Sequence, residues 1–233
     1  MRKKYVLANW KMNQLIADID EFFKKLEVKN DHITVGIAPQ ALHLPLLLRF
    51  TASHKFLVGA QNLSNYEKGA YTGELSPLSL KDLKVDFVLI GHSERRIIFK
   101  EDDATLNTKL LNALKHGLLP VFCVGETLSE RESGKTFEVI SRQLEIGLNG
   151  VTTGFVIAYE PVWAIGTGKT ATTLQAEEVH QFIRGKVGDI SILYGGSVNP
   201  DNAPSLMASP NIDGLLVGGA SLDASSFNKL FCS

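Results

Sequence analysis

Short, uninterrupted apolar segments recur along the whole chain, and this repetition limits the folds that the chain can adopt. The segments span residues 5–8, 33–38, 56–60, 87–90, 118–124, 155–159, 190–194 and 212–217. They are rich in β-branched and aromatic residues and have Gly or Pro nearby, which favours buried strands. Because polar residues hardly alternate with apolar ones, we expect both faces of each strand to be covered, as in parallel sheets.

The stretches between these segments have the spacing of amphipathic helices. Three apolar stripes are Leu15, Ile19, Phe22, Phe23 and Leu26; Leu106, Leu110, Ala113 and Leu114; and Phe137, Ile140 and Leu144. A strand followed by a helix, about eight times in 233 residues, predicts an α/β fold, a single (β/α)₈ barrel domain over residues 1–233. A doubly wound open sheet is the alternative that periodicity alone leaves open.

Charge and cysteine content narrow the class of function. The chain has 24 basic and 25 acidic residues, so no basic surplus favours nucleic acid or an anionic membrane, and a small-molecule partner is expected. The two cysteines, Cys123 and Cys232, indicate a reducing compartment rather than a disulfide framework. No apolar run approaches the roughly 20 residues that a membrane-spanning helix needs. We therefore expect a cytoplasmic protein with no nucleic-acid and no membrane partner.

Polar or glycine residues follow nearly every apolar segment. The carboxyl ends of the strands form the active face of a (β/α)₈ barrel, so we expect these residues to meet at one mouth. They are Asn9-Trp10-Lys11, Gln61-Asn62, Gly91-His92-Ser93-Glu94, Gly125-Glu126, Glu160-Pro161, Gly195-Gly196-Ser197 and Gly218-Gly219. Packing alone does not explain so many titratable groups at these positions.

Glu160 is the candidate catalytic base. It ends a wholly apolar strand, where partial desolvation makes a carboxylate a stronger base. Residues 161–169 after it are apolar in the middle and contain glycines near one end, as suits a loop that folds over a ligand and excludes water. The alternative is a carboxylate that pairs with a nearby Lys or Arg at a loop edge; we favour the base.

His92 and Lys11 are candidates to act with that base. A helical turn that begins at His92 would direct its positive end at the imidazole and disfavour the imidazolium. The ammonium of Lys11 could hold an anionic oxygen, although a lone lysine at such a position is more often a solvated loop residue. Neither His-x-His nor His-Glu-x-x-His occurs in the sequence, so we expect no metal site.

Glycines indicate a phosphate site. Two Gly-Gly pairs, at 195–196 and 218–219, follow the last two strands, where barrels commonly bind phosphate through backbone N–H groups. Gly166 could add a donor from the loop after Glu160. Each pair alone could simply make a tight turn, but both pairs in these places point to phosphate.

At these positions the sequence resembles the triosephosphate isomerase family, whose fold is the TIM barrel. The matching stretches run in the family's order across nearly the whole chain: 9–13, 91–96, 158–169, 194–198 and 217–221. The long stretch around Glu160 is highly specific. The resemblance implies the interconversion of dihydroxyacetone phosphate and glyceraldehyde 3-phosphate through an enediolate, a reaction of glycolysis and gluconeogenesis, without a cofactor.

The resemblance also implies a role for each candidate residue. Glu160 would move a proton between two carbons, neutral His92 would polarise the carbonyl, Lys11 would stabilise the enediolate, and Asn9 would orient the substrate. Backbone N–H groups would hold the phosphate at Gly166, Ser197, Gly218 and Gly219. Supporting residues would be Ser93 and Glu94, next to His92 and Lys11, and Glu126, which would steady the loop near Trp163.

The family is usually dimeric, through a loop after the third strand that enters the neighbouring subunit. Residues 61–62 and 69–74 match that loop. The resemblance therefore implies a homodimer in which Thr72 lies beside the partner's Asn9 and the partner's Lys11. Glu74 would pair with the partner's Arg95.

Rival interpretations stay open at the level of sequence. Another phosphate-binding barrel, such as a sugar-phosphate epimerase or an indole glycerol-phosphate synthase, shares the fold. A barrel that has lost activity and acts as a binding protein would be expected to lack Lys11, His92 or Glu160. A second, non-catalytic role beside the enzyme would leave no mark in the sequence. The segment 170–193 is shorter than in most family members, and we expect Gly185 and Gly188 to end its helix early.

Overall fold

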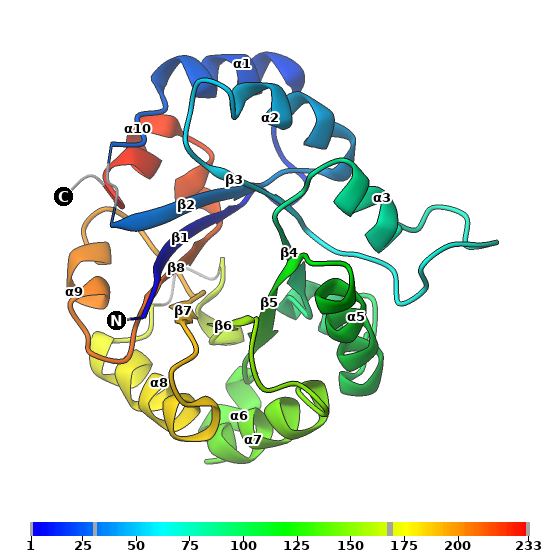
Figure 1. The fold of residues 1–233 in the computed structure, drawn as a ribbon. Helices are drawn as coiled ribbons and strands as arrows, with labels where there is room; N and C mark the ends of the chain where they lie inside the picture. The colour runs from blue at the N-terminus through cyan, green and yellow to red at the C-terminus, as the bar shows by residue number, and fades with distance from the viewer. Residues whose placement is uncertain (1, 30–31, 167–169, 232–233) are drawn as a thin grey trace.

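Eight parallel strands close into a barrel, each paired with its neighbours in chain order (Figure 1). The structure, a computed structural model, describes residues 2–29, 32–166 and 170–231. The strands are β1 (Lys4–Asn9), β2 (Ile33–Ala38), β3 (Leu57–Ala60), β4 (Phe87–Ile90), β5 (Leu119–Val124), β6 (Val156–Tyr159), β7 (Ile192–Tyr194) and β8 (Gly214–Val217). β8 pairs with β1, with Tyr5 opposite Gly214, and this closure excludes the open doubly wound sheet.

Helices ring the barrel, as the strand–helix repetition predicts (Figure 1). The α-helices are α1 (Ile16–Lys25), α2 (Leu44–Phe50), α3 (Pro77–Asp82), α4 (Ser93–Ile97), α5 (Asp103–Lys115), α6 (Leu128–Glu132), α7 (Thr136–Gly147), α8 (Thr173–Val187), α9 (Ala203–Met207) and α10 (Ala224–Asn228). The short 3₁₀ helices are η1 (Ala41–His43), η2 (Val162–Ala164) and η3 (Gly219–Ser221).

The strands are buried on both faces, which accounts for their continuous apolar sequences. One cluster of side chains fills the barrel, and a larger one lies between the strands and the helices. The ring of Phe87 occupies the barrel interior. A Cβ atom at Gly59 would lie 2.2 Å from that ring, and one at Gly36 would lie 2.8 Å from it. Glycine at both positions therefore makes room for the aromatic side chain.

Several strands begin later than their apolar segments predict. Phe56, Leu118, Phe155 and Ile212 are buried, yet β3, β5, β6 and β8 begin one or two residues after them. These side chains belong to the cluster between the strands and the helices, so burial extends beyond strand pairing. Leu15 was wrongly assigned to an apolar stripe: it precedes α1 and is 72% exposed.

Helix α8 is longer than the glycines suggest. It passes through Gly185 and ends at Val187, and its C-cap Gly188 has a φ of 66°, a positive angle that glycine adopts without strain. Arg184 donates to the carbonyl oxygens of Gly188 and Ile190 and so ties the helix end to the start of β7. Of the two glycines expected to end the helix, Gly188 caps it, whereas Gly185 does not interrupt it, because packing of α8 on the barrel outweighs the low helix propensity of one glycine.

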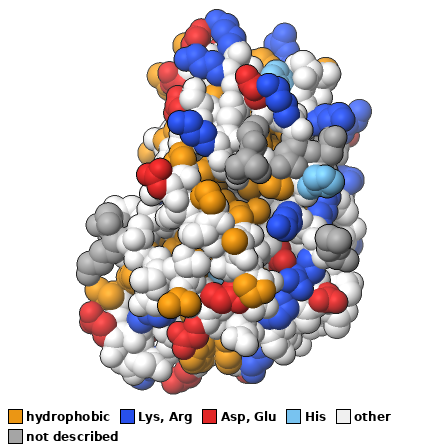
Figure 2. Space-filling view, turned by 90° about the vertical axis from the view of Figure 1, so that its left-hand side faces the viewer, with side chains coloured by type: hydrophobic (Ala, Val, Ile, Leu, Met, Phe, Trp, Pro, Cys, Tyr) orange, Lys and Arg blue, Asp and Glu red, His pale blue; other side chains and the backbone are white. Residues whose placement is uncertain are grey.

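The side of the molecule that carries α9 and α10 shows acidic and basic side chains interspersed, with no extended field of one sign (Figure 2). In the described part of the chain, no helix combines the length and apolarity that crossing a membrane requires.

Candidate active site

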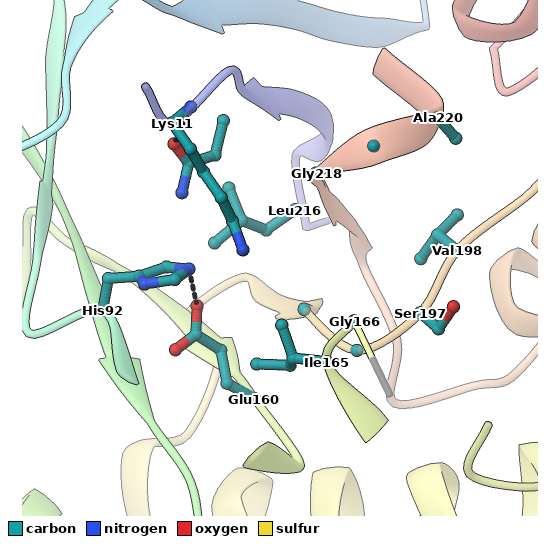
Figure 3. Close-up of a pocket in the computed structure, with 14 residues that line it drawn as sticks. Lys11, His92, Glu160, Ile165, Gly166, Ser197, Val198, Leu216, Gly218 and Ala220 are labelled. Carbon is teal, nitrogen blue, oxygen red and sulfur yellow. Dashed lines mark hydrogen bonds and ion pairs between the residues drawn. The ribbon is translucent and has the colours of Figure 1, made fainter. Parts of the chain in front are cut away.

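A cavity of about 220 Å³ lies at the mouth of the barrel, where the carboxyl ends of the strands meet (Figure 3). Residues that sequence analysis placed at separate strand ends line it together: Asn9, Lys11, His92, Glu160, Gly166, Ser197, Gly218 and Gly219. Ile165, Val198 and Leu216 give one part of its wall an apolar character. The cavity thus combines titratable groups, glycine backbone and an apolar wall.

Glu160 follows β6 directly and is 1% exposed. Its Oε2 accepts a hydrogen bond from the backbone N–H of Ser93 at 2.8 Å, and its Oε1 lies 3.2 Å from Nε2 of His92 (Figure 3). Close packing of backbone positions this residue: a Cβ atom at Gly125 would lie 1.8 Å from the Glu160 carbonyl oxygen. Oε1 of this buried carboxylate accepts no hydrogen bond, so it is able to take a proton.

His92 is the N-cap of α4, as its place after β4 suggested. Its Nδ1 accepts a hydrogen bond from the backbone N–H of Glu94 at 3.2 Å. An imidazole nitrogen that accepts from an N–H carries no proton, so the proton of the neutral ring resides on Nε2. Nε2 lies 3.2 Å from Glu160 Oε1 and makes no hydrogen bond to it, so its N–H is available as a donor.

Lys11 has an unusual backbone, with φ of 51°. Polar contacts hold it in this strained conformation: Asn9 Oδ1 accepts its N–H at 3.0 Å, and Gln61 Nε2 donates to its carbonyl oxygen at 2.8 Å. Its ammonium donates to Glu94 Oε1 at 2.7 Å. The side chain lies across the cavity from Glu160 and brings a positive charge to it (Figure 3).

The glycine-rich turns after β7 and β8 form the other end of the cavity. Gly218 precedes η3 and Gly219 begins it. A Cβ atom at Gly218 would lie 3.8 Å from Lys11 Cε. The Ser197 N–H is occupied, because it donates to the Ala164 carbonyl oxygen at 3.0 Å. An anion can bind this N–H only after that hydrogen bond opens.

Comparison with known proteins agrees with this geometry. The family model described as Triosephosphate isomerase matches residues 4–233. The triosephosphate isomerase of Moorella thermoacetica is 48% identical, with 97% of each chain covered. That of Legionella pneumophila is 47% identical over 99% of this chain and 98% of its own. That of Leptospira biflexa is 48% identical over 95% and 96%. The chain belongs to the triosephosphate isomerase family.

The loop after Glu160 contacts Glu126, which follows β5 and is the residue expected to steady that loop. Glu126 Oε1 accepts from Trp163 Nε1 at 3.0 Å, from the Tyr159 hydroxyl at 3.1 Å, and from Arg131 at 3.2 Å. Burial raises the pKa of Tyr159, so the phenol stays protonated and remains a donor. Residues 167–169 of the loop lie outside the described residues, as does Cys232.

The segment between β3 and α3, residues 61–76, extends away from the barrel (Figure 1). We call it the arm. Thr72 and Glu74 are exposed on it. Arg95 is engaged within its own chain, since Nε and Nη2 both lie 2.7 Å from Glu101 Oε1. Glu74 and Arg95 line the same open cavity, of about 580 Å³.

Sequence reasoning missed several contributors to this family site. Gln61 was expected at the mouth and in the arm but was given no role, yet it donates to the Lys11 carbonyl. Tyr159 was assigned to an apolar strand, and Arg131 carried no motif. Ser93 was expected to support His92 and Lys11, and the bond from its N–H to Glu160 was not anticipated. A search for polar atoms at the ends of apolar strands could have found Tyr159, but no local signal announces the other contacts.

Proposed function

We propose that this chain interconverts dihydroxyacetone phosphate and D-glyceraldehyde 3-phosphate through an enediolate. The observation that carries the proposal is the pairing of Glu160 with His92, a buried carboxylate 3.2 Å from the protonated nitrogen of a neutral imidazole. Moving a carbonyl group between neighbouring carbons needs these two parts, a base for the carbon-bound proton and a donor for the carbonyl oxygen.

In the proposed reaction Glu160 takes a proton from C1 of dihydroxyacetone phosphate. The C–H bond breaks, an O–H bond forms on the carboxylate, and the electron pair moves into the C1–C2 bond as the carbonyl π electrons move to oxygen. His92 Nε2–H stabilises the negative oxygen and transfers protons between the two oxygens. Glu160 then returns its proton to C2 and is ionised again, so that no cofactor is consumed.

Lys11 and Asn9 act on the same intermediate. The ammonium offsets the negative charge of the enediolate, and the amide of Asn9 orients the substrate at the cavity wall. Backbone N–H groups of Gly166, Gly218 and Gly219 bind the phosphate. Ser197 joins them once its N–H leaves the Ala164 carbonyl, which couples phosphate binding to a shift of the loop after Glu160.

The proposed enzyme is a cytoplasmic homodimer in which the arm of each subunit enters the other. Exposed apolar side chains support this assembly: Met12 is 86% exposed, Leu42 71% and Phe99 62%, and all three line the open cavity beside the active site. Thr72 at the arm would contact the partner's Lys11, and Glu74 would reach the partner's Arg95. Burial of these apolar groups would drive the association.

A coupled assay of glyceraldehyde 3-phosphate isomerisation tests the proposal, with a Glu160→Gln variant beside the parent. We expect fast turnover in the parent and near-total loss in the variant, because an amide cannot accept the carbon-bound proton. A folded, dimeric parent without activity would contradict the reaction and favour a binding role for the barrel. Dilution of the parent to a fully active monomer would contradict the proposed coupling of dimer and active site.

A further inference from the structure

A second cavity lies behind Glu160, on the side away from the substrate cavity. It has a volume of about 130 Å³ and is lined by residues that include Ser93, Ile97, Thr127, Glu130, Gln143 and Glu160. We call it the rear cavity. It lies between α4, α6 and the carboxyl end of β5. Among the described residues, Glu160 is the one that lines both cavities, so it stands between them.

The rear cavity connects this buried carboxylate with the surface. At its inner end Gln143 and Glu160 are buried, whereas Ile97 at its outer end is 45% exposed. The space is enough for several water molecules, since about 10–15 Å³ of such volume holds one. Ser93, Thr127, Glu130 and Gln143 line it with polar groups. The Gln143 amide bonds the Gly125 backbone, and Thr127 bonds Glu130, so a water chain would use the acceptor lone pairs that these groups keep. Water can therefore approach Glu160 from behind.

The position of this water matters only while Glu160 holds a proton. In the proposed mechanism a substrate fills the mouth cavity and excludes water from the front of the carboxylate. The carboxylic acid formed by proton abstraction then has two fates: it returns its proton to the neighbouring carbon, or it exchanges the proton with water. With the front occupied, the rear cavity is the contact with water that remains.

We propose that solvent protons reach Glu160 through the rear cavity during turnover, and that Ile97 controls their access. The exchange breaks the O–H bond of the protonated carboxyl group and forms an O–D bond from D₂O, with release of HOD and no net change of charge. The carboxyl group then delivers deuterium instead of the original proton. This inference rests on the proposed isomerase reaction, and it assigns an access route that the reaction itself does not require.

The test measures where the proton goes. Glyceraldehyde 3-phosphate is isomerised in D₂O, the dihydroxyacetone phosphate is reduced as it forms so that it cannot re-enter the site, and NMR gives the fraction deuterated at C1. The variants are Ile97→Trp, which plugs the rear cavity, and Ile97→Ala, which opens it. Leu111→Trp and Leu111→Ala on α5 are matched controls, because Leu111 is 42% exposed and does not line the rear cavity.

We expect Ile97→Trp to lower the deuterated fraction severalfold and Ile97→Ala to raise it, while turnover and the Leu111 variants stay close to the parent. An active enzyme with the same deuterated fraction in all variants would overturn the proposed route. The route would also be overturned if the deuterated fraction changed in the same direction in both Ile97 variants, or if it changed only together with a loss of turnover. Either result would indicate that the substitutions disturb Glu160 itself. An inactive parent would instead overturn the isomerase reaction and the route with it.

Discussion

Two buried carboxylates, at opposite ends of the barrel, have contrasting surroundings. Asp213, just before β8 at the amino-terminal face, accepts from Arg2 Nε at 2.7 Å, from the Ile192 N–H at 3.0 Å, and from Arg184. Glu160, just after β6 at the mouth, accepts from the Ser93 N–H, and its other oxygen has no hydrogen bond in this structure. Both are nearly inaccessible to solvent.

The difference in partners indicates that Asp213 stabilises the fold, whereas Glu160 remains available for proton transfer. A carboxylate with two cationic partners and a backbone donor has both oxygens engaged, and its removal leaves the buried cationic partners unpaired. A carboxylate with an incomplete set of partners is less stabilised but retains the capacity to take a proton. Substitutions at the two ends should therefore change different measurable quantities.

The largest effect on stability is expected at the amino-terminal face. Asp213→Ala leaves Arg184 without its anionic partner and should lower the free energy of unfolding by roughly 3 kcal/mol. Turnover per folded molecule should stay near the parent value, because Asp213 does not line the mouth cavity. Denaturant unfolding and a steady-state assay on the same preparation measure both. A large loss of turnover in the folded variant would remove the distinction between the two carboxylates.

The converse change is Glu160→Asp. It retracts the carboxylate by about 1 Å and should lower turnover roughly 10²-fold, since proton transfer depends on the position of the base. Stability should change little, because the partner set at this position is incomplete already. Steady-state kinetics and denaturant unfolding report the two quantities. Unimpaired turnover would contradict the assignment of Glu160 as the base.

His180, in the middle of α8, makes the stability of the fold depend on pH. It is fully buried against the rings of Tyr159 and Tyr194, and desolvation lowers its pKa from 6.5 to about 4. As pH falls from 6.5 toward 4, the unfolded chain binds a proton that the folded chain does not, so stability decreases by up to about 3 kcal/mol. Above pH 6.5 this contribution to stability is fully present.

Denaturant unfolding at fixed protein concentration, at pH 7 and at pH 4.5, checks this expectation. His180→Gln removes the titrating group and should flatten the pH dependence of unfolding, even if it lowers stability at pH 7. Carboxylates titrate in the same range in both proteins, so the difference between parent and variant isolates the histidine. Equal slopes in the two proteins would show that His180 does not contribute.

The smallest effect is expected where α8 begins. The Thr172 hydroxyl accepts from the Gln175 N–H at 3.2 Å, and Gln175 Oε1 accepts from the Thr172 N–H at 2.9 Å. Loss of this capping box in Thr172→Ala should lower stability by about 1 kcal/mol, less than Asp213→Ala at the opposite end. Thermal unfolding of the two variants compares the helix cap with the ion pairs. Equal losses would indicate that the charged cluster adds nothing beyond a cap.

The strands could be predicted because burial on both faces leaves an apolar record in the sequence. Their first residues could not, since Phe56 and Ile212 are buried without being paired. At the mouth, polar residues directly after strands identified Asn9, Lys11, His92 and Glu160 as candidates, and the structure brings these four to one cavity. Gln61 also follows a strand, but its contact with Lys11 could not be predicted, because an amide at that position can bond many different partners.

What the sequence determined by itself is the order of the elements, the alternation of strand and helix that makes the fold α/β, and which strand ends carry reactive groups. These follow from local patterns of apolar and polar residues. Tertiary structure decided which atoms meet: the Ser93 N–H with Glu160, the Glu94 N–H with His92 Nδ1, and the rear cavity behind the base. Ser93 and Glu160 are 67 residues apart, so their contact exists only after the barrel closes. Hydrogen bonds depend on distances of tenths of an ångström, and only the packed fold sets those distances.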